Sequence, residues 1–313
     1  MQPMKLARAI GYALLAVSVA YFIAAAWRHA GSLPAIAWNS WALAAFGAVM
    51  LLYLAQFLTG GIAWHLWLTS VREPSQPAVA VALFSLSQIA KYVPGSVAQH
   101  IARVALGRRY GLGTPGMVVT IALEQGCAIM ACIAIASGIM ALAGPAAIGV
   151  ELPSSLAIAL IAVIALMLPL TGVWLVGENR PAIMDRWLGP QRIAHPGIAT
   201  LATCFVLSCA NFAVSGLAVD LLARHLFGAE GHLLTAIGVF AAAWVAGMVA
   251  IVSPGGIGVR EAVMVAGLTP VYGAGTALGV AVCYRVVTSI GDGVGFLLGF
   301  LAEKRLARAQ RTA

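Results

Sequence analysis

Residues 85–103 read SLSQIAKYVPGSVAQHIAR, a proline–glycine break that carries two cations inside a mostly apolar chain. Residues 252–262, VSPGGIGVREA, repeat this theme about 160 residues later. At membrane depth such a break leaves backbone N–H and C=O groups unpaired, which costs several kcal/mol for each group unless protein or water covers it. Two interpretations are open: a chain reversal that lines a polar cavity, or a proline kink in an ordinary spanning helix. The occurrence of the break at two matched positions favours the reversal.

The composition excludes a soluble domain. Hydrophobic residues make up 62% of the chain and charged residues 9%, with a mean hydropathy of +0.97, whereas about 25% charged residues is usual in soluble domains. The net charge of +8 comes from cations dispersed through short loops and membrane segments, so we expect anionic lipid rather than nucleic acid as the partner. Neither the five cysteines nor the histidines have the spacing of a metal site, and we expect no disulfide, metal or cofactor.

Apolar runs of about 20 residues predict six full membrane spans. They cover roughly residues 7–26, 41–69, 115–143, 155–176, 198–222 and 273–302. The broken segments, 79–106 and 235–268, each consist of two pieces, and those of the first are about 14 and 11 residues long, too short to cross a ~30 Å hydrocarbon core. The first span is expected to be retained, with cleavage as a signal peptide the alternative. We therefore predict an all-α polytopic membrane protein with one domain, 1–313, that ends in a short basic cytoplasmic tail, 303–313.

The distribution of lysine and arginine distinguishes the two interpretations of the broken segments, re-entrant hairpin and kinked spanning helix. If both broken segments are re-entrant and the N-terminus is inside, 12 of the 18 cations face the inside, 2 face the outside and 4 lie in the membrane. If each segment spans once, the cations outside the membrane divide into 8 and 6. The positive-inside rule therefore favours two re-entrant hairpins. We expect a protein of the bacterial inner membrane with both termini on the cytoplasmic side. The order helix, helix, hairpin, helix then occurs in 1–143 and again, from the opposite side, in 155–302, which predicts an inverted-topology repeat.

The candidate binding site consists of the two breaks and the charged residues near them. Helices that restart at Gly95 and Gly256 present free N–H groups to an anion, and Arg103 and Arg260 follow closely enough to reach the same cavity. Guanidinium is a favoured partner of phosphate, and an arginine in a membrane segment is a functional hypothesis by default. The predicted substrate-binding residues are Lys91, Pro94, Gly95, Arg103, Glu124, Pro254, Gly255, Gly256, Arg260, Glu261 and Arg285.

Some of these charges have an alternative, structural interpretation. Lys91 and Arg103 can extend to the inner membrane interface instead of facing a cavity. Glu261 can neutralise its neighbour Arg260.

Two further charges follow the breaks at nearly equal distances. Glu124 lies 30 residues beyond the first proline and Arg285 lies 31 beyond the second. They either pair with each other across the repeat interface, act separately on a substrate and a coupling proton, or form structural ion pairs. Asp220 and Asp292 carry weaker signals, and Asp220, near the end of a span, is expected at the membrane interface.

The motifs around the breaks resemble one known family, the transmembrane flippase region of lysylphosphatidylglycerol synthases and its stand-alone relatives. The residues that carry the resemblance are KYVPG at 91–95 with Arg103 and Glu124, PGGIGVREA at 254–262, and Tyr284-Arg285. The resemblance covers about residues 40–300, and the second motif is the more specific. The family often has an arginine directly after the glutamate and an aspartate shortly beyond it, where this chain has Gln125 and Ala128.

The resemblance implies movement of a lipid between leaflets through two cavities related by an inverted repeat. The soluble aminoacyl-transferase domain of the bifunctional synthases has no counterpart here, so the resemblance does not imply transfer of lysine to lipid. We expect a lipid flippase and no enzymatic activity, with an anionic phospholipid or a polyprenyl-linked glycan as substrate. The lipid phosphate would lie near the two breaks, where Arg103 and Arg260 receive it from opposite sides.

Two other functions stay open. An intramembrane lipid-modifying or glycosyl transferase would need an activating acid or metal-binding carboxylates, and the acids in this sequence are scattered. An accessory membrane subunit of a lipid synthase would depend on its enzyme. The expected partners are therefore membrane lipids. Two candidates for a protein partner stay open: a second copy of the chain, in a homodimer, and a lipid- or glycan-synthesis enzyme.

Overall fold

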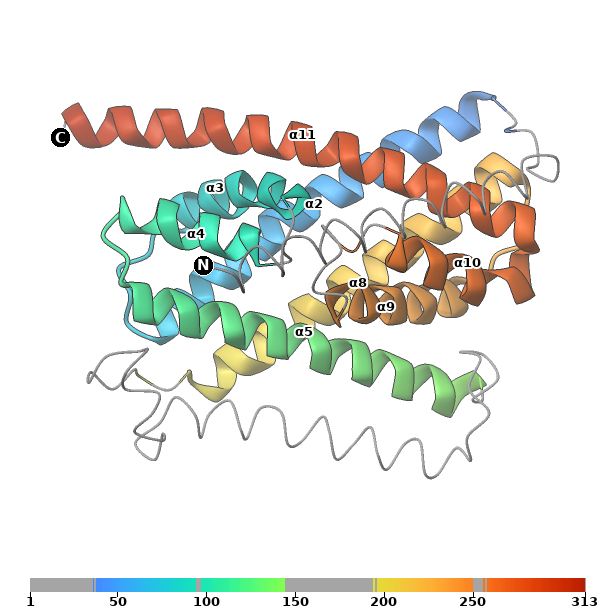
Figure 1. The fold of residues 1–313 in the computed structure, drawn as a ribbon, viewed down its shortest axis with the longest axis horizontal. Helices are drawn as coiled ribbons and strands as arrows, with labels where there is room; N and C mark the ends of the chain where they lie inside the picture. Colours follow the sequence, from blue (N-terminus) through green and yellow to red (C-terminus); the bar gives the residue numbers. More distant parts are fainter. Residues whose placement is uncertain are drawn as a thin grey trace, which may run out of the picture.

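The fold is known from a computed structural model that describes residues 36, 38–93, 97–143, 194, 196–249, 256 and 258–312. Its helices, in chain order, are α2 (Ser40–Ser70), α3 (Pro77–Gln88), the 3₁₀ turn η2 (Ile89–Tyr92), α4 (Ala98–Arg108), α5 (Thr114–Ala143), α8 (Ile198–Phe227), α9 (Leu233–Val249), α10 (Val259–Tyr272) and α11 (Ala274–Thr312) (Figure 1). The predicted spans 7–26 and 155–176 lie outside the described residues. So do four of the predicted site residues, Pro94, Gly95, Pro254 and Gly255.

Four of the described helices are long and apolar enough to cross a membrane. They are α2, residues 114–139 of α5, α8, and residues 274–308 of α11, which contain between 26 and 35 residues. At 1.5 Å per residue each exceeds a ~30 Å hydrocarbon core. Large apolar side chains such as Leu51 and Ile198 are exposed on these helices, as expected when the solvent is lipid. The chain is thus an all-α polytopic membrane protein, as predicted.

The first broken segment reverses its direction. Its pieces, α3 and α4, contain 12 and 11 residues, and neither can cross the membrane alone. The backbone N–H of Gly113, just before α5, donates a hydrogen bond of 2.7 Å to the carboxylate of Glu73, just before α3. The chain therefore leaves this segment at the place where it entered, and the prediction of a hairpin is confirmed here.

The second broken segment is closed in the same way by Asp220, near the C-terminal end of α8. Its carboxylate accepts hydrogen bonds from the backbone N–H of His232, just before α9, at 2.8 Å and from the hydroxyl of Tyr272, at the end of α10, at 2.7 Å. Arg224 adds an ion pair at 2.7 Å. Sequence analysis gave Asp220 a minor, interfacial role, but the residue is only 1% exposed and ties the two ends of the hairpin together.

The two hairpins begin at opposite ends of the bundle. Helices α2 and α8 are antiparallel, because Trp41 stacks on His225 near one end while Cys204 lies beside the carbonyl of Ala63 near the other. Each hairpin follows the C-terminal end of its helix, so α3 and α4 lie toward one end of the bundle and α9 and α10 toward the other (Figure 1). The inverted-repeat prediction requires this arrangement. The inversion of the complete halves stays a prediction, since the first predicted span of each half lies outside the described residues.

Two helix ends differ from the predicted boundaries. Helix α8 continues to Phe227, where Gly228 in a left-handed conformation (φ 65°) ends it. Helix α11 continues through Thr312, so residues 303–312 extend the last helix, and their place on the cytoplasmic side stays a prediction. The reason is local: after Gly299 this stretch contains neither glycine nor proline and is rich in alanine, leucine and arginine, which favour helix.

Candidate functional site

The described residues beside the two breaks, here called the hairpin tips, line one cavity in the middle of the bundle: Lys91 and Val97 in the first hairpin, Gly256 and Arg260 in the second. Its volume is about 450 Å³, and its walls come from α2, α3, α4, α5, α8, α9, α10 and α11. Every predicted site residue that the structure describes lines this cavity: Lys91, Arg103, Glu124, Gly256, Arg260, Glu261 and Arg285. The sequence therefore identified residues that do come together, although the resemblance implied two cavities and these residues share one. Their role in binding a substrate stays a prediction.

Arg103, on α4, is held inside the protein by an ion pair and two aromatic rings. Its Nη1 lies 2.7 Å from the Glu124 carboxylate of α5, and its guanidinium carbon lies 4.5 Å from the centre of the Phe84 ring and 5.1 Å from that of Trp64. The residue is 1% exposed, so the alternative in which it extends to the membrane interface was wrong. Glu124 pairs with this arginine and not with Arg285.

The corresponding pair in the second half has the opposite arrangement of charges. Glu261, on α10, lies 3.5 Å from Arg285 on α11, and its second carboxylate oxygen accepts a 2.6 Å hydrogen bond from the backbone N–H of Gly258. This hydrogen bond caps the N-terminus of α10. The bonds of the Glu261 carboxylate are thus made to Gly258 and Arg285 and none is made to Arg260, so neutralisation of Arg260 by its neighbour does not take the form of a direct ion pair. In each half, the helix after the break is joined to the long helix that follows it, by an arginine in one half and a glutamate in the other.

Asp292, on α11, is the site residue whose importance sequence analysis underrated. Its carboxylate forms an ion pair of 2.7 Å with Lys91 and accepts hydrogen bonds of 2.6 Å from the hydroxyls of Tyr53 and Tyr92. It is 1% exposed. An acid inside a membrane segment is itself a signal of function, and Asp292 lies seven residues, or two turns, after Arg285, on the same face of α11. Tyr92 belongs to the KYVPG motif but was not among the predicted site residues, and nothing in the sequence pointed to Tyr53.

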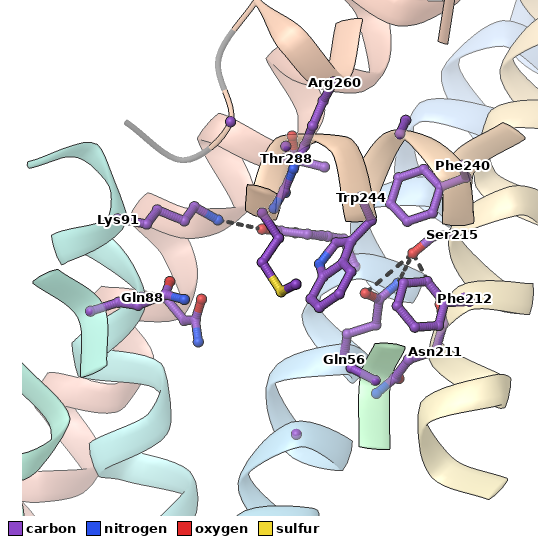
Figure 2. A pocket seen from close by; sticks show the side chains of 18 of the residues that line it. Gln56, Gln88, Lys91, Asn211, Phe212, Ser215, Phe240, Trp244, Arg260 and Thr288 are labelled. Carbon is purple, nitrogen blue, oxygen red and sulfur yellow. Dashed lines mark hydrogen bonds between the residues drawn. The ribbon is translucent and has the colours of Figure 1, made fainter. Parts of the chain in front are cut away.

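Arg260 differs from the other cations of the cavity, because the described part of the chain offers it no partner. No described carboxylate lies within 4.0 Å of its guanidinium, and its buried Nε makes no hydrogen bond. In Figure 2 its side chain points toward the space that Lys91 also faces. Lys91, Arg103 and Arg285 each have a carboxylate partner, although single nitrogens of the two arginines also lack a hydrogen bond.

Two glycines give the Arg260 side chain its place. A Cβ atom on Gly247 of α9 would lie 2.5 Å from Arg260 Cγ and 2.6 Å from its Nε, and one on Gly256 would lie 2.8 Å from the same Nε. Gly256 also has a φ of 72°, a left-handed conformation that favours glycine. Any side chain at either position would displace the guanidinium.

We expect Gly247→Ala to weaken the interaction of the cavity with an anion by about tenfold, because a small displacement of a positioned charge has a large effect. Gly138→Ala on α5 is the matched control, since a Cβ atom there meets nothing within 4 Å. Binding of an anionic lipid to the purified variants measures the difference. Equal binding by both variants would show that the position of Arg260 is unimportant.

The fold and this site define a class of protein: a multi-pass membrane protein with a buried, cation-rich cavity between two reversing helical segments. The chain matches the family described as lysylphosphatidylglycerol synthase TM region over residues 8–293, and it belongs to that family. The resemblance seen in the sequence motifs is thereby confirmed. A comparison with curated proteins finds no match. Membership of the family makes this a membrane protein of lipid synthesis or translocation.

Proposed function

We propose that this protein is a flippase that moves an anionic lipid between the leaflets of a bacterial inner membrane, with both termini in the cytoplasm. The observation that carries the proposal is Arg260, whose guanidinium has no carboxylate partner among the described residues and faces a cavity of about 450 Å³. An unpaired charge in a membrane segment is costly, and a phosphodiester offers it two charge-assisted hydrogen bonds. The phosphate of a lipid headgroup supplies the missing negative charge.

The state of the acidic residues favours transport over a transferase reaction. Glu124, Glu261 and Asp292 each form an ion pair with a cation of the cavity wall. An ion pair stabilises the ionised form of a carboxylate, so the paired group is a weaker general base for a transferase reaction than a free carboxylate would be. Among the described residues of the wall, the three pairs leave Arg260 as one net positive charge, which suits the binding of a single phosphodiester.

The arrangement of the hairpins supports movement of the headgroup across the membrane. The hairpins begin at opposite ends of the bundle, and both tips reach the same cavity. A shift of one tip would open the cavity toward one membrane surface while the other tip keeps it closed. The acyl or polyprenyl chains would stay in the surrounding bilayer during this exchange.

The proposal is tested with the full-length protein in liposomes that contain a fluorescent phosphatidylglycerol. A membrane-impermeant reductant bleaches only the outer leaflet of protein-free liposomes, and we expect it to bleach both leaflets when the protein is present. Mass spectrometry of the same lipids separates transport from chemistry, because a flippase returns the lipid unchanged. Bleaching confined to the outer leaflet contradicts the proposal, and the appearance of a modified lipid supports the transferase instead.

A further inference from the structure

The cavity wall also contains carboxamide groups with free hydrogen-bond donors and acceptors. Gln88 on α3, Gln125 on α5 and Asn211 on α8 all line it. Within the described residues, neither glutamine makes a side-chain hydrogen bond, and Asn211 uses only its oxygen, which accepts from Thr59 at 2.9 Å. A carboxamide both donates and accepts hydrogen bonds without carrying charge. Three helices thus direct neutral donors and acceptors toward the space that Arg260 faces.

An aromatic surface lies beside these amides. Trp244 of α9 lines the cavity and meets the edge of Phe212, with the ring centres 5.3 Å apart. In Figure 2 the indole lies between the side of the cavity that carries Gln88 and the side that carries Asn211. Aromatic rings present a large, rigid apolar face, which can pack against the C–H groups of a polyol or sugar while amides bind its hydroxyls.

The charges of the cavity wall disfavour a headgroup that carries an ammonium group. The two carboxylates that line the cavity in the described part, Glu124 and Glu261, are bonded to Arg103 and Arg285. A headgroup with an ammonium group would therefore find no free carboxylate to accept it, and it would approach Arg260, a like charge. Like charges brought together at a desolvated site oppose binding strongly.

We propose that the lipid taken by this cavity is a phosphodiester with an uncharged, polyhydroxylated headgroup, and that aminoacylated and other amine-bearing headgroups are rejected. This inference rests on the proposed function, because it names the substrate class of the same site. Arg260 binds the phosphate, and the carboxamides of Gln88, Gln125 and Asn211 bind the hydroxyls. The same chemistry is present in the glycerol headgroup of a phospholipid and in a sugar on a polyprenyl phosphate.

Competition binding to the purified full-length protein tests this inference without a transport assay. Native mass spectrometry compares phosphatidylglycerol, a glucosyl polyprenyl phosphate, lysyl-phosphatidylglycerol, and phosphatidylmethanol, which has the same charge as phosphatidylglycerol and no free hydroxyl. We expect at least one polyhydroxylated lipid to bind about fivefold or more tightly than phosphatidylmethanol, and the tighter of the two identifies the source. Lysyl-phosphatidylglycerol is expected to bind at least about tenfold more weakly than phosphatidylglycerol. Equal binding of phosphatidylmethanol and both polyhydroxylated lipids, or strong binding of the lysyl lipid, overturns the inference.

Two variants test the two parts of the inference separately. Gln125→Met, which keeps the length of the side chain, is expected to reduce the preference for hydroxylated headgroups and to leave phosphatidylmethanol binding unchanged. Asn211→Asp keeps the acceptor for Thr59 and adds a carboxylate with no cation partner, so it is expected to admit the lysyl lipid. If neither variant changes selectivity, the amides do not recognise the headgroup and the inference fails. Selective binding without movement between leaflets would instead refute the proposed transport while the substrate class stands.

Discussion

Arg260→Gln is expected to abolish lipid movement between leaflets while the protein stays folded. The guanidinium donates charge-assisted hydrogen bonds worth about 1.5–3 kcal/mol each, and the loss of even one of them lowers the affinity for the phosphate by roughly 10- to 150-fold. Because Arg260 has no carboxylate partner within the described residues, its removal leaves no buried anion uncompensated. The free energy of unfolding is therefore expected to be unchanged or higher in the variant, whereas removing one partner of a buried ion pair lowers it.

The measurement is the rate of bleaching of inner-leaflet lipid, with circular dichroism and detergent unfolding as the record of folding. Arg260→Lys keeps the charge but not the planar pair of donors, and we expect an intermediate rate. Arg109→Gln removes an exposed cation of the loop after α4 and serves as the matched control, with an unchanged rate. Transport by Arg260→Gln at the rate of the control variant would contradict the proposal that Arg260 binds the lipid phosphate.

The hairpins and the gathering of charges could be predicted because each follows from a local or additive property of the sequence. Short helical pieces around Pro94 and Pro254 cannot span a membrane, and a count of lysines and arginines decides the side on which the chain emerges. The hydrogen bonds at Glu73 and Asp220 show that both segments do return to their starting points. The same reasoning placed Arg260 near the breaks, where the structure finds it facing the cavity.

The partners of the charges could not be predicted, because pairing depends on how the helices pack. Lys91 and Asp292 are 201 residues apart in the sequence and 2.7 Å apart in the fold. Glu124 and Arg285 occupy similar positions after their breaks, which left a pairing between them as one of three interpretations, and in the fold each bonds a residue of the hairpin before it. The amides and the indole of the cavity wall were not predicted either, because Asn and Gln in a membrane helix can equally serve helix–helix hydrogen bonding and Trp can anchor an interface, and only the fold shows that these side chains converge.

One consequence of these pairs is that a single helix binds both hairpin tips. Helix α11 holds the first hairpin through Asp292 and Lys91, and the second through Arg285 and Glu261. The two α11 residues are seven positions apart, so they lie on the same face of the helix. A tip that moves to open the cavity must first separate from this face, and the strength of each pair therefore sets how readily that side opens.

Asp292→Asn is expected to destabilise the protein by about 3 kcal/mol, because it leaves the partly buried ammonium of Lys91 without a counter-ion. The asparagine also replaces a carboxylate that accepts two tyrosine hydroxyls. We expect the loss to be greatest at the first hairpin tip, so that hydrogen exchange at 89–92 accelerates more than exchange in α10. Equilibrium unfolding in mixed detergents and hydrogen-exchange mass spectrometry measure the two effects.

Glu303→Gln on the same helix is the matched control. Glu303 accepts one hydrogen bond of 3.0 Å from Tyr110, outside the cavity, and its replacement by an amide is expected to cost no more than about 1 kcal/mol. The double variant Lys91→Met/Asp292→Leu removes both charges, so it should recover much of the stability lost in Asp292→Asn, since a buried pair replaced by apolar groups is often nearly neutral. Two results would contradict this account: a double variant no more stable than Asp292→Asn, or an Asp292→Asn variant as stable as the control. Either would show that Asp292 does not stabilise the protein by balancing the charge of Lys91. The double variant also separates the role of the pair in stability from its role in opening. Its first hairpin tip is expected to stay folded but to lack the ion pair that holds it to α11. Its rate of lipid movement therefore measures how far that ion pair limits opening of the cavity.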